Sequence, residues 1–126
     1  MRRSITTGTA LVGTLLAGIL APLSGAAAHA SLDHADPRVG STVKASPAEV
    51  RVWFSEAVEP ASVLRVLDQV GAPADQGNTG VDPGDHTLVK VSLRPLLSPG
   101  TYKVLWRAST ADGATTVGSF GFTVAA

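Results

Sequence analysis

Short stretches in which every second residue is apolar constrain this fold more than any other feature of the sequence. Residues 100–108 and 117–124 both show this alternation. A period of two is typical of a β-strand that buries one of its faces. We therefore expect the two stretches to pair as a hairpin that closes a hydrophobic core. The side chains expected on its inward face are Tyr102, Val104, Trp106, Ala108, Phe120, Phe122 and Val124.

Similar strand patterns occur at residues 49–55, 62–68 and 86–93. In 62–68 the pattern leaves the inward face open between two registers. Residues 70–85 are rich in Gly, Pro, Asp and Asn, which indicates mostly loop with one short edge strand. No stretch of helical length has a sustained period near 3.6 residues. The sequence therefore predicts an all-β fold, a small antiparallel Greek-key β-sandwich or barrel of about seven strands.

Residues 1–28 have the order of an export signal: Arg2 and Arg3, an apolar run at 10–23, and alanines at 26–28. A membrane span needs roughly 20 predominantly apolar residues, and this run is shorter and interrupted. We expect a soluble, exported domain at 29–126, with no transmembrane segment, either periplasmic or extracellular. The small-residue rule allows cleavage before His29 and also before Ser31.

Composition restricts the ligands and partners of the processed chain. Arg2 and Arg3 are two of ten basic residues, which leaves eight against ten acidic ones. This balance argues against nucleic acid or anionic lipid as a partner. The sequence contains no Cys, and Met1 is its only Met. Nitrogen and oxygen donors must therefore hold any metal bound by residues 29–126.

Several fragments, taken in order, resemble the CopC family of exported copper-binding proteins. Each is common alone, but together they span essentially the whole of residues 29–126. They are His29-Ala30-Ser31-Leu32 with Asp36-Pro37 and Gly40, then Phe54-Ser55-Glu56, Leu97 to Tyr102, Trp106-Arg107, Asp112-Gly113 and Gly118-Ser119-Phe120.

The resemblance implies an immunoglobulin-like or cupredoxin-like sandwich that binds Cu(II). By position, His29 would bind through its amine and imidazole, and Asp112 through its carboxylate. The family's second His falls at Ala114, and Thr115 stands where the family usually has Pro. Glu56 and His34 are the candidate auxiliary ligands. Both nitrogens of His29 must be unprotonated to bind, so affinity should fall with pH.

Each candidate ligand also has a simpler interpretation. An Asp-Gly pair between two strands favours a turn, so Asp112 has a structural role available without metal. Glu56 follows a strand end and is typical of a solvated carboxylate. His34 and His86 are polar residues of exposed segments, and His86 is the weaker ligand candidate.

The resemblance implies a non-catalytic protein that buffers copper or passes it to a membrane transporter of CopD type. The alternative is a degenerate CopC-like sandwich without metal that acts as an interaction module for a membrane protein. No spacing of the three histidines indicates a hydrolytic triad, and a second His for a copper oxygenase is lacking.

Overall fold

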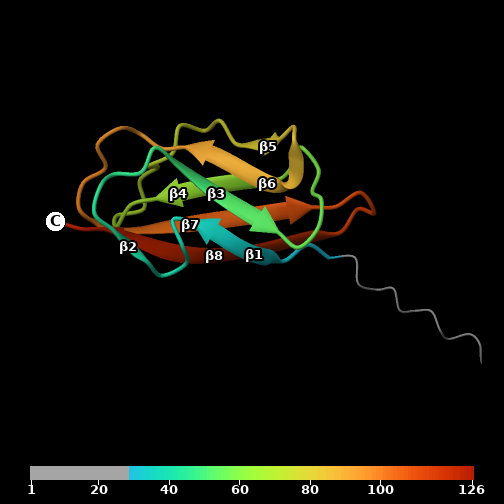
Figure 1. The fold of residues 1–126 in the computed structure, drawn as a ribbon, viewed down its shortest axis with the longest axis horizontal. Coiled ribbons are helices and arrows are strands. Elements are labelled where there is room, and N and C mark those ends of the chain that lie inside the picture. The colour runs from blue at the N-terminus through green and yellow to red at the C-terminus, as the bar shows by residue number, and fades with distance from the viewer. Residues whose placement is uncertain (1–28) are drawn as a thin grey trace, which may run out of the picture.

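The computed structural model describes residues 29–126 as a sandwich of two four-stranded sheets (Figure 1). One sheet has the order β1-β3-β6-β5 and the other the order β2-β8-β7-β4. The predicted Greek-key sandwich is confirmed, with eight strands where about seven were expected. The predicted leader, residues 1–28, lies outside the described residues. The strands are β1 (Leu32–Asp36), β2 (Thr42–Val43), β3 (Glu49–Phe54), β4 (Val63–Leu67), β5 (Gly80–Asp82), β6 (Asp85–Ser92), β7 (Gly100–Ser109) and β8 (Thr115–Val124).

The longest strands, β7 and β8, form the expected hairpin. Their register runs from Gly100 opposite Val124 to Ser109 opposite Thr115, without a bulge. Of the residues that the structure describes, none belongs to a helix long and apolar enough to cross a membrane. The strand predictions are correct to within one or two residues at each end, and the short strand expected within 70–85 is β5.

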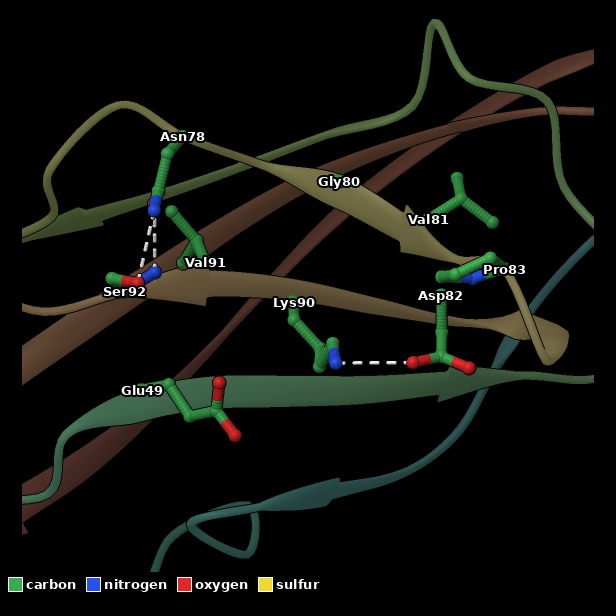
Figure 2. Close-up of a pocket in the computed structure, with 9 residues that line it drawn as sticks. All are labelled: Glu49, Asn78, Gly80, Val81, Asp82, Pro83, Lys90, Val91 and Ser92. Atoms are coloured by element: carbon green, nitrogen blue, oxygen red, sulfur yellow. Dashed lines mark hydrogen bonds and ion pairs between the residues drawn. The ribbon is translucent and has the colours of Figure 1, made fainter.

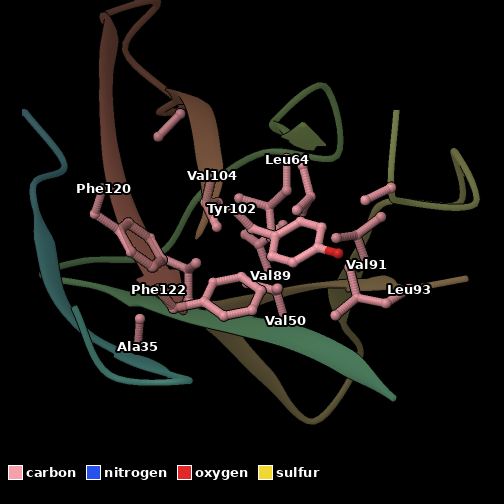
Figure 3. Packing of buried hydrophobic residues seen from close by; sticks show 14 of the residues in the cluster. Ala35, Val50, Leu64, Val89, Val91, Leu93, Tyr102, Val104, Phe120 and Phe122 are labelled. Atoms are coloured by element: carbon pink, nitrogen blue, oxygen red, sulfur yellow. The ribbon is translucent and has the colours of Figure 1, made fainter. Parts of the chain in front are cut away.

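The core lies between the sheets and is built from the alternating apolar residues (Figure 3). In β4 the structure selects Leu64 and Val66 for the interior and leaves Val63 exposed. Complete burial of one such aliphatic side chain contributes roughly 1.5–3 kcal/mol. The largest fully buried side chains are Phe122, Leu64, Val50, Val52, Val66, Val89, Val91 and Val104.

Two strands carry little sequence signal. The register of β1 against β3 shifts between Leu32 and His34, and this irregularity breaks the alternation within β1. β2 contains two residues and was not predicted. It pairs in parallel with β8, which is an exception to the antiparallel sandwich that the sequence predicts. Both strands depend on partners far along the chain, so local alternation does not identify them.

The outer strand β4 is protected on its free side by the segment that follows it. Asp75 is 3% exposed, and its carboxylate accepts a hydrogen bond from the backbone N–H of Val66 at 2.7 Å. It also accepts one from Gly77 N–H at 2.8 Å. The hydroxyl of Thr79 accepts from Leu64 N–H at 3.2 Å. These contacts satisfy backbone groups that an outer strand otherwise offers to another chain.

Candidate metal site

The chain segment that follows His29 is held at one end of the sandwich. The hydroxyl of Thr116 donates to the Ala30 carbonyl at 2.7 Å, and the Ala30 side chain is buried. Ser31 N–H donates to Ser55 Oγ at 2.9 Å, and Ser55 N–H donates to the Ser31 carbonyl at 2.8 Å. The segment is therefore tied both to the end of β3 and to the beginning of β8, which belong to different sheets.

The turn between β7 and β8 lies at the same end of the sandwich (Figure 1). Gly113 N–H donates to the Thr110 carbonyl at 2.9 Å, and Thr110 N–H donates to the Ala114 carbonyl at 3.0 Å. Gly113 has a φ of 88°, a left-handed conformation that favours glycine. The Asp-Gly pair therefore does make a turn here, as the simpler interpretation of Asp112 requires.

The carboxylate of Asp112 is fixed by two hydrogen bonds that end on the same oxygen. Oδ1 accepts from the Thr110 hydroxyl at 2.5 Å and from Ala114 N–H at 3.1 Å. These donors hold the pKa of Asp112 below its ordinary value, the Thr110 hydroxyl having the largest effect. The side chain is exposed and ionised at neutral pH, and neither bond uses Oδ2.

His29 and Asp112 lie at the same end of the sandwich, because Ala30 is bonded to Thr116, four residues after Asp112. The charge of His29 contributes, as the smallest of the named causes, to the lowered pKa of Asp112. Both residues are exposed. An exposed pair at one end of a sandwich is accessible to a dissolved ion, and imidazole nitrogen with carboxylate oxygen is a donor set that suits Cu(II).

The structure places the two auxiliary candidates differently. Glu56 is half-buried and follows Ser55, the residue tied to Ser31, so its backbone lies at the same end as His29. The imidazole of His34 stacks on Trp53, with ring centroids 4.4 Å apart and planes at 9°. Its Nδ1 lies 2.7 Å from a carboxylate oxygen of Asp33. This histidine belongs to the outer surface of the β1-β3-β6-β5 sheet.

Within residues 29–126, no three of the His, Asp and Glu side chains are close enough together to hold a metal ion. The structure thus brings His29 and Asp112 to one end but does not assemble the four predicted ligands into one cluster. His86, the weaker candidate, is the exposed second residue of β6, and its carbonyl accepts from Val58 N–H at 2.9 Å.

A polar groove beside β5 contains none of the predicted ligands (Figure 2). Lys90 Nζ and Asp82 Oδ1 are 3.0 Å apart, and hydrogen bonding to Lys90 is the main cause of the lowered pKa of Asp82. Asn78 exchanges hydrogen bonds with Ser92, both at 2.9 Å. Glu49, which also lines the groove, pairs with Arg51 at 2.6 Å. Each charged residue of the groove therefore already has a partner, and we assign no ligand to it.

Two residues that support the site were not among the candidates from the sequence. Thr110 orients Asp112, and a threonine two positions before a turn aspartate was a local signal for this contact. Thr116 fixes the start of the domain through Ala30, 86 positions earlier in the chain. No local pattern predicts that second contact.

The protein is a small β-sandwich domain that carries the nitrogen donor His29 and the oxygen donor Asp112 at one end. The chain belongs to the CopC family, because the CopC domain matches residues 32–125. The predicted resemblance is therefore confirmed, and the protein is related to copper resistance and transport proteins.

Solved structures and curated relatives agree with this assignment. CopC from Methylosinus trichosporium OB3b superposes with a TM-score of 0.71 at 31% identity, covering 77% of this chain and 94% of that one. PcoC from Escherichia coli, described as a methionine-rich copper resistance protein, gives a TM-score of 0.66 at 30% identity, covering 77% and 99%.

Among the curated relatives, Escherichia coli YobA is 32% identical over 98 residues, which are 77% of this chain and 79% of YobA. The copper transport protein CutJ of Bacillus subtilis is 30% identical over 98 residues, again 77% of this chain. The chain spans only 18% of the length of CutJ. The same domain therefore also occurs as a small part of a much longer protein.

Proposed function

We propose that this protein is exported and binds Cu(II) at the end of the sandwich formed by the start of the domain and the β7–β8 turn. The observation that carries the proposal is that the Thr116–Ala30 hydrogen bond ties the segment directly after His29 to the start of β8, at the end of the sandwich that carries Asp112. Membership of a copper-related family supports it. The proposal assigns the protein no catalytic role.

In this proposal His29 is the anchor. Cleavage of the leader after Ala28 would give His29 a free amine, so a single residue would offer two nitrogens. Asp112 would supply an oxygen that is already ionised and oriented by Thr110. Cu(II) prefers a tetragonal set of such donors. Water or Glu56 would complete that set, because the imidazole of His34 is stacked on Trp53 and paired with Asp33.

The proposed site is pH-dependent in a direction that follows from its donors. The amine and the imidazole bind only when unprotonated, because a protonated nitrogen has no lone pair to offer the metal. The pKa of Asp112 is lowered, so this carboxylate is ionised at neutral pH and its protonation does not weaken binding there. Affinity should therefore fall as the pH drops.

Titration of Cu(II) into the natural secreted product, after its intact mass has been measured, tests the proposal. We expect His29→Ala and Asp112→Asn each to weaken binding by at least tenfold, an effect of about 1.4 kcal/mol or more. His86→Ala is the matched control and should bind like the unaltered protein. Unchanged affinity in the His29 variant, or a mass showing that His29 is removed, would contradict the proposed site.

We further propose that the bound copper is buffered outside the cytoplasm or passed to a membrane transporter of CopD type. The match to part of the longer CutJ, named a copper transport protein, supports this role. If it is correct, disruption of the gene should change copper accumulation or tolerance in the source cell. Expression of an Asp112→Asn variant should not restore the original phenotype.

A second candidate function is an interaction module that has kept the fold and lost the metal. Ala114 and Thr115 replace the family's second His and its Pro, and no three-ligand cluster exists within residues 29–126. Ala114→His separates the two functions. A gain in Cu(II) affinity of about a hundredfold, or about 2.7 kcal/mol, would favour the module, since the native site would then be incomplete. A gain below about threefold would favour copper binding by the native donors.

A further inference from the structure

The two sheets of the sandwich carry charges of opposite sign. The strands β2, β8, β7 and β4 contain no Asp or Glu, and they contribute three cations, Arg65, Lys103 and Arg107. The strands of the other sheet contain five acidic residues and two cations, Arg51 and Lys90. One sheet is therefore basic in a described domain that has more acidic than basic residues.

The outer surface of the basic sheet mixes cations with exposed apolar side chains. In one cross-strand row Arg107 lies between Val63 and Val117, and in the next row Leu105 lies beside Arg65. Val117 is 71% exposed, Val63 39% and Leu105 37%. We call this surface the basic face and define it as Val63, Arg65, Lys103, Leu105, Arg107 and Val117.

Two cations of the basic face have no partner within the described domain. Lys103 and Arg107 form no side-chain hydrogen bond or ion pair with any residue of 29–126. Arg65 shares the buried Asp75, with Nε 3.4 Å from the carboxylate. Exposed aliphatic groups that occur singly are ordinary, but here three of them adjoin unpaired cations in neighbouring rows.

We propose that the basic face is the docking surface for another protein, whose own surface presents carboxylates around an apolar centre. Such a partner would cover Val63, Leu105 and Val117 and pair its carboxylates with Lys103 and Arg107. Burial of the apolar side chains provides affinity, while the opposite charges orient the two proteins and accelerate their association.

The order of residues within the rows favours a protein partner over a membrane. Arg107 stands between the two valines of its row, so these valines cannot enter a lipid interior without taking the guanidinium with them. Membrane-surface elements instead separate their charged and apolar residues onto different faces. A protein can place a carboxylate opposite each cation and an apolar side chain opposite each valine.

The basic face adjoins the candidate metal site but does not include it. Arg107 and Val117 are two residue pairs from the end of β7 and the start of β8. A docked partner would therefore lie beside the β7–β8 turn. Docking requires no metal, so it can be tested on metal-free protein, and its failure would leave the copper proposal intact.

The test follows the backbone NMR signals of metal-free protein during addition of a short synthetic peptide in which glutamates surround a pair of leucines. We expect the largest shifts at Val63, Leu105, Arg107 and Val117. Because salt screens exposed charges, binding should weaken when ionic strength rises from about 20 mM to about 300 mM. The same peptide with lysines in place of glutamates should not bind.

Two double variants, each lacking two cations, test whether the peptide binds to the basic face or responds only to the overall charge of the protein. Lys103→Ser combined with Arg107→Ser should weaken peptide binding by about fivefold, because each exposed ion pair contributes modestly. Arg38→Ser combined with Arg94→Ser is the matched control and should bind normally. Circular dichroism establishes that each variant is folded. Equal binding by both double variants, or shifts centred elsewhere, would overturn the proposal.

Two further measurements test other possible occupants of the basic face. Sedimentation of the protein alone at low salt reports self-association, and flotation with vesicles containing anionic lipid reports membrane binding. Self-association that is lost in the Lys103 and Arg107 double variant would replace the proposed partner with a second copy. Vesicle binding without peptide binding would replace it with a membrane.

Discussion

The contact between Gly118 and Trp106 leads to a specific prediction about stability. The two residues are cross-strand partners on the inward side of β7 and β8. A Cβ atom added at Gly118 would lie 2.4 Å from Trp106 Cζ2 and 2.6 Å from its Cε2, so the indole would have to move. The indole also packs edge-on against Phe54, at a centroid distance of 5.2 Å.

The expected cost follows from this crowding. Overpacking a core by one methyl group typically costs 1–3 kcal/mol, so Gly118→Ala should destabilise the domain by about 2 kcal/mol. In a domain of this size that corresponds to a fall in Tm of about 10 °C. Gly121→Ala, in the same strand, is the matched control because its added Cβ would come no closer than 3.4 Å, to the Tyr102 carbonyl oxygen.

Urea unfolding of a double-mutant cycle measures whether the indole is the cause. With Trp106→Leu the obstacle is absent, and Gly118→Ala should then be neutral or stabilise by about 0.5 kcal/mol, since alanine loses less backbone entropy than glycine. The coupling between the two changes should therefore be about 2 kcal/mol. If Gly118→Ala costs the same in both backgrounds, or no more than Gly121→Ala, the reasoning is refuted.

Two further predictions concern carboxylates. Asp75→Ala should lower the free energy of unfolding by about 2 kcal/mol in urea titrations, because the buried N–H of Val66 would lose its acceptor and Gly77 N–H would lose a hydrogen bond. A cost below that of an average surface substitution would contradict this role. Thr110→Val should raise the pKa of Asp112 towards its ordinary value in a carboxyl-carbon NMR titration, and Thr110→Ser should not. Because this pKa is lowered on folding, ionised Asp112 stabilises the protein above its unfolded pKa, and that contribution disappears as the pH falls through the folded pKa. An unchanged pKa in the valine variant would exclude the hydroxyl as the cause.

The fragments that carried the family resemblance have physical roles that the structure makes visible. Trp106 requires a glycine opposite, which explains why Trp106-Arg107 and Gly118-Ser119-Phe120 occur together. The hydroxyl of Tyr102 donates to the Ser98 carbonyl at 2.6 Å, fixing the loop that leads into β7. Much of the resemblance therefore reflects the requirements of the sandwich, and only part of it concerns metal.

The candidate site was only partly predictable from the sequence. His29 and Asp112 were selected by their positions in the resemblance. They are more than eighty residues apart in the sequence, so the distance between them in space could not be predicted. The sequence also offered His34 as an auxiliary, without indicating that its imidazole stacks on Trp53. Thr116, which anchors the chain start, carried no local signal because its partner is the Ala30 carbonyl.

Alternation, turn residues and composition determined by themselves that this chain forms a β-sandwich, where its longer strands lie, and that nitrogen and oxygen must serve as any metal ligands of residues 29–126. These properties depend on neighbours in the chain. Tertiary structure decided which face of β4 is buried, the pairing of the short β1 and β2, the placement of His29 and Asp112 at one end, and the rows of the basic face. Each of these depends on strand register and on contacts between distant segments, which local pattern does not specify.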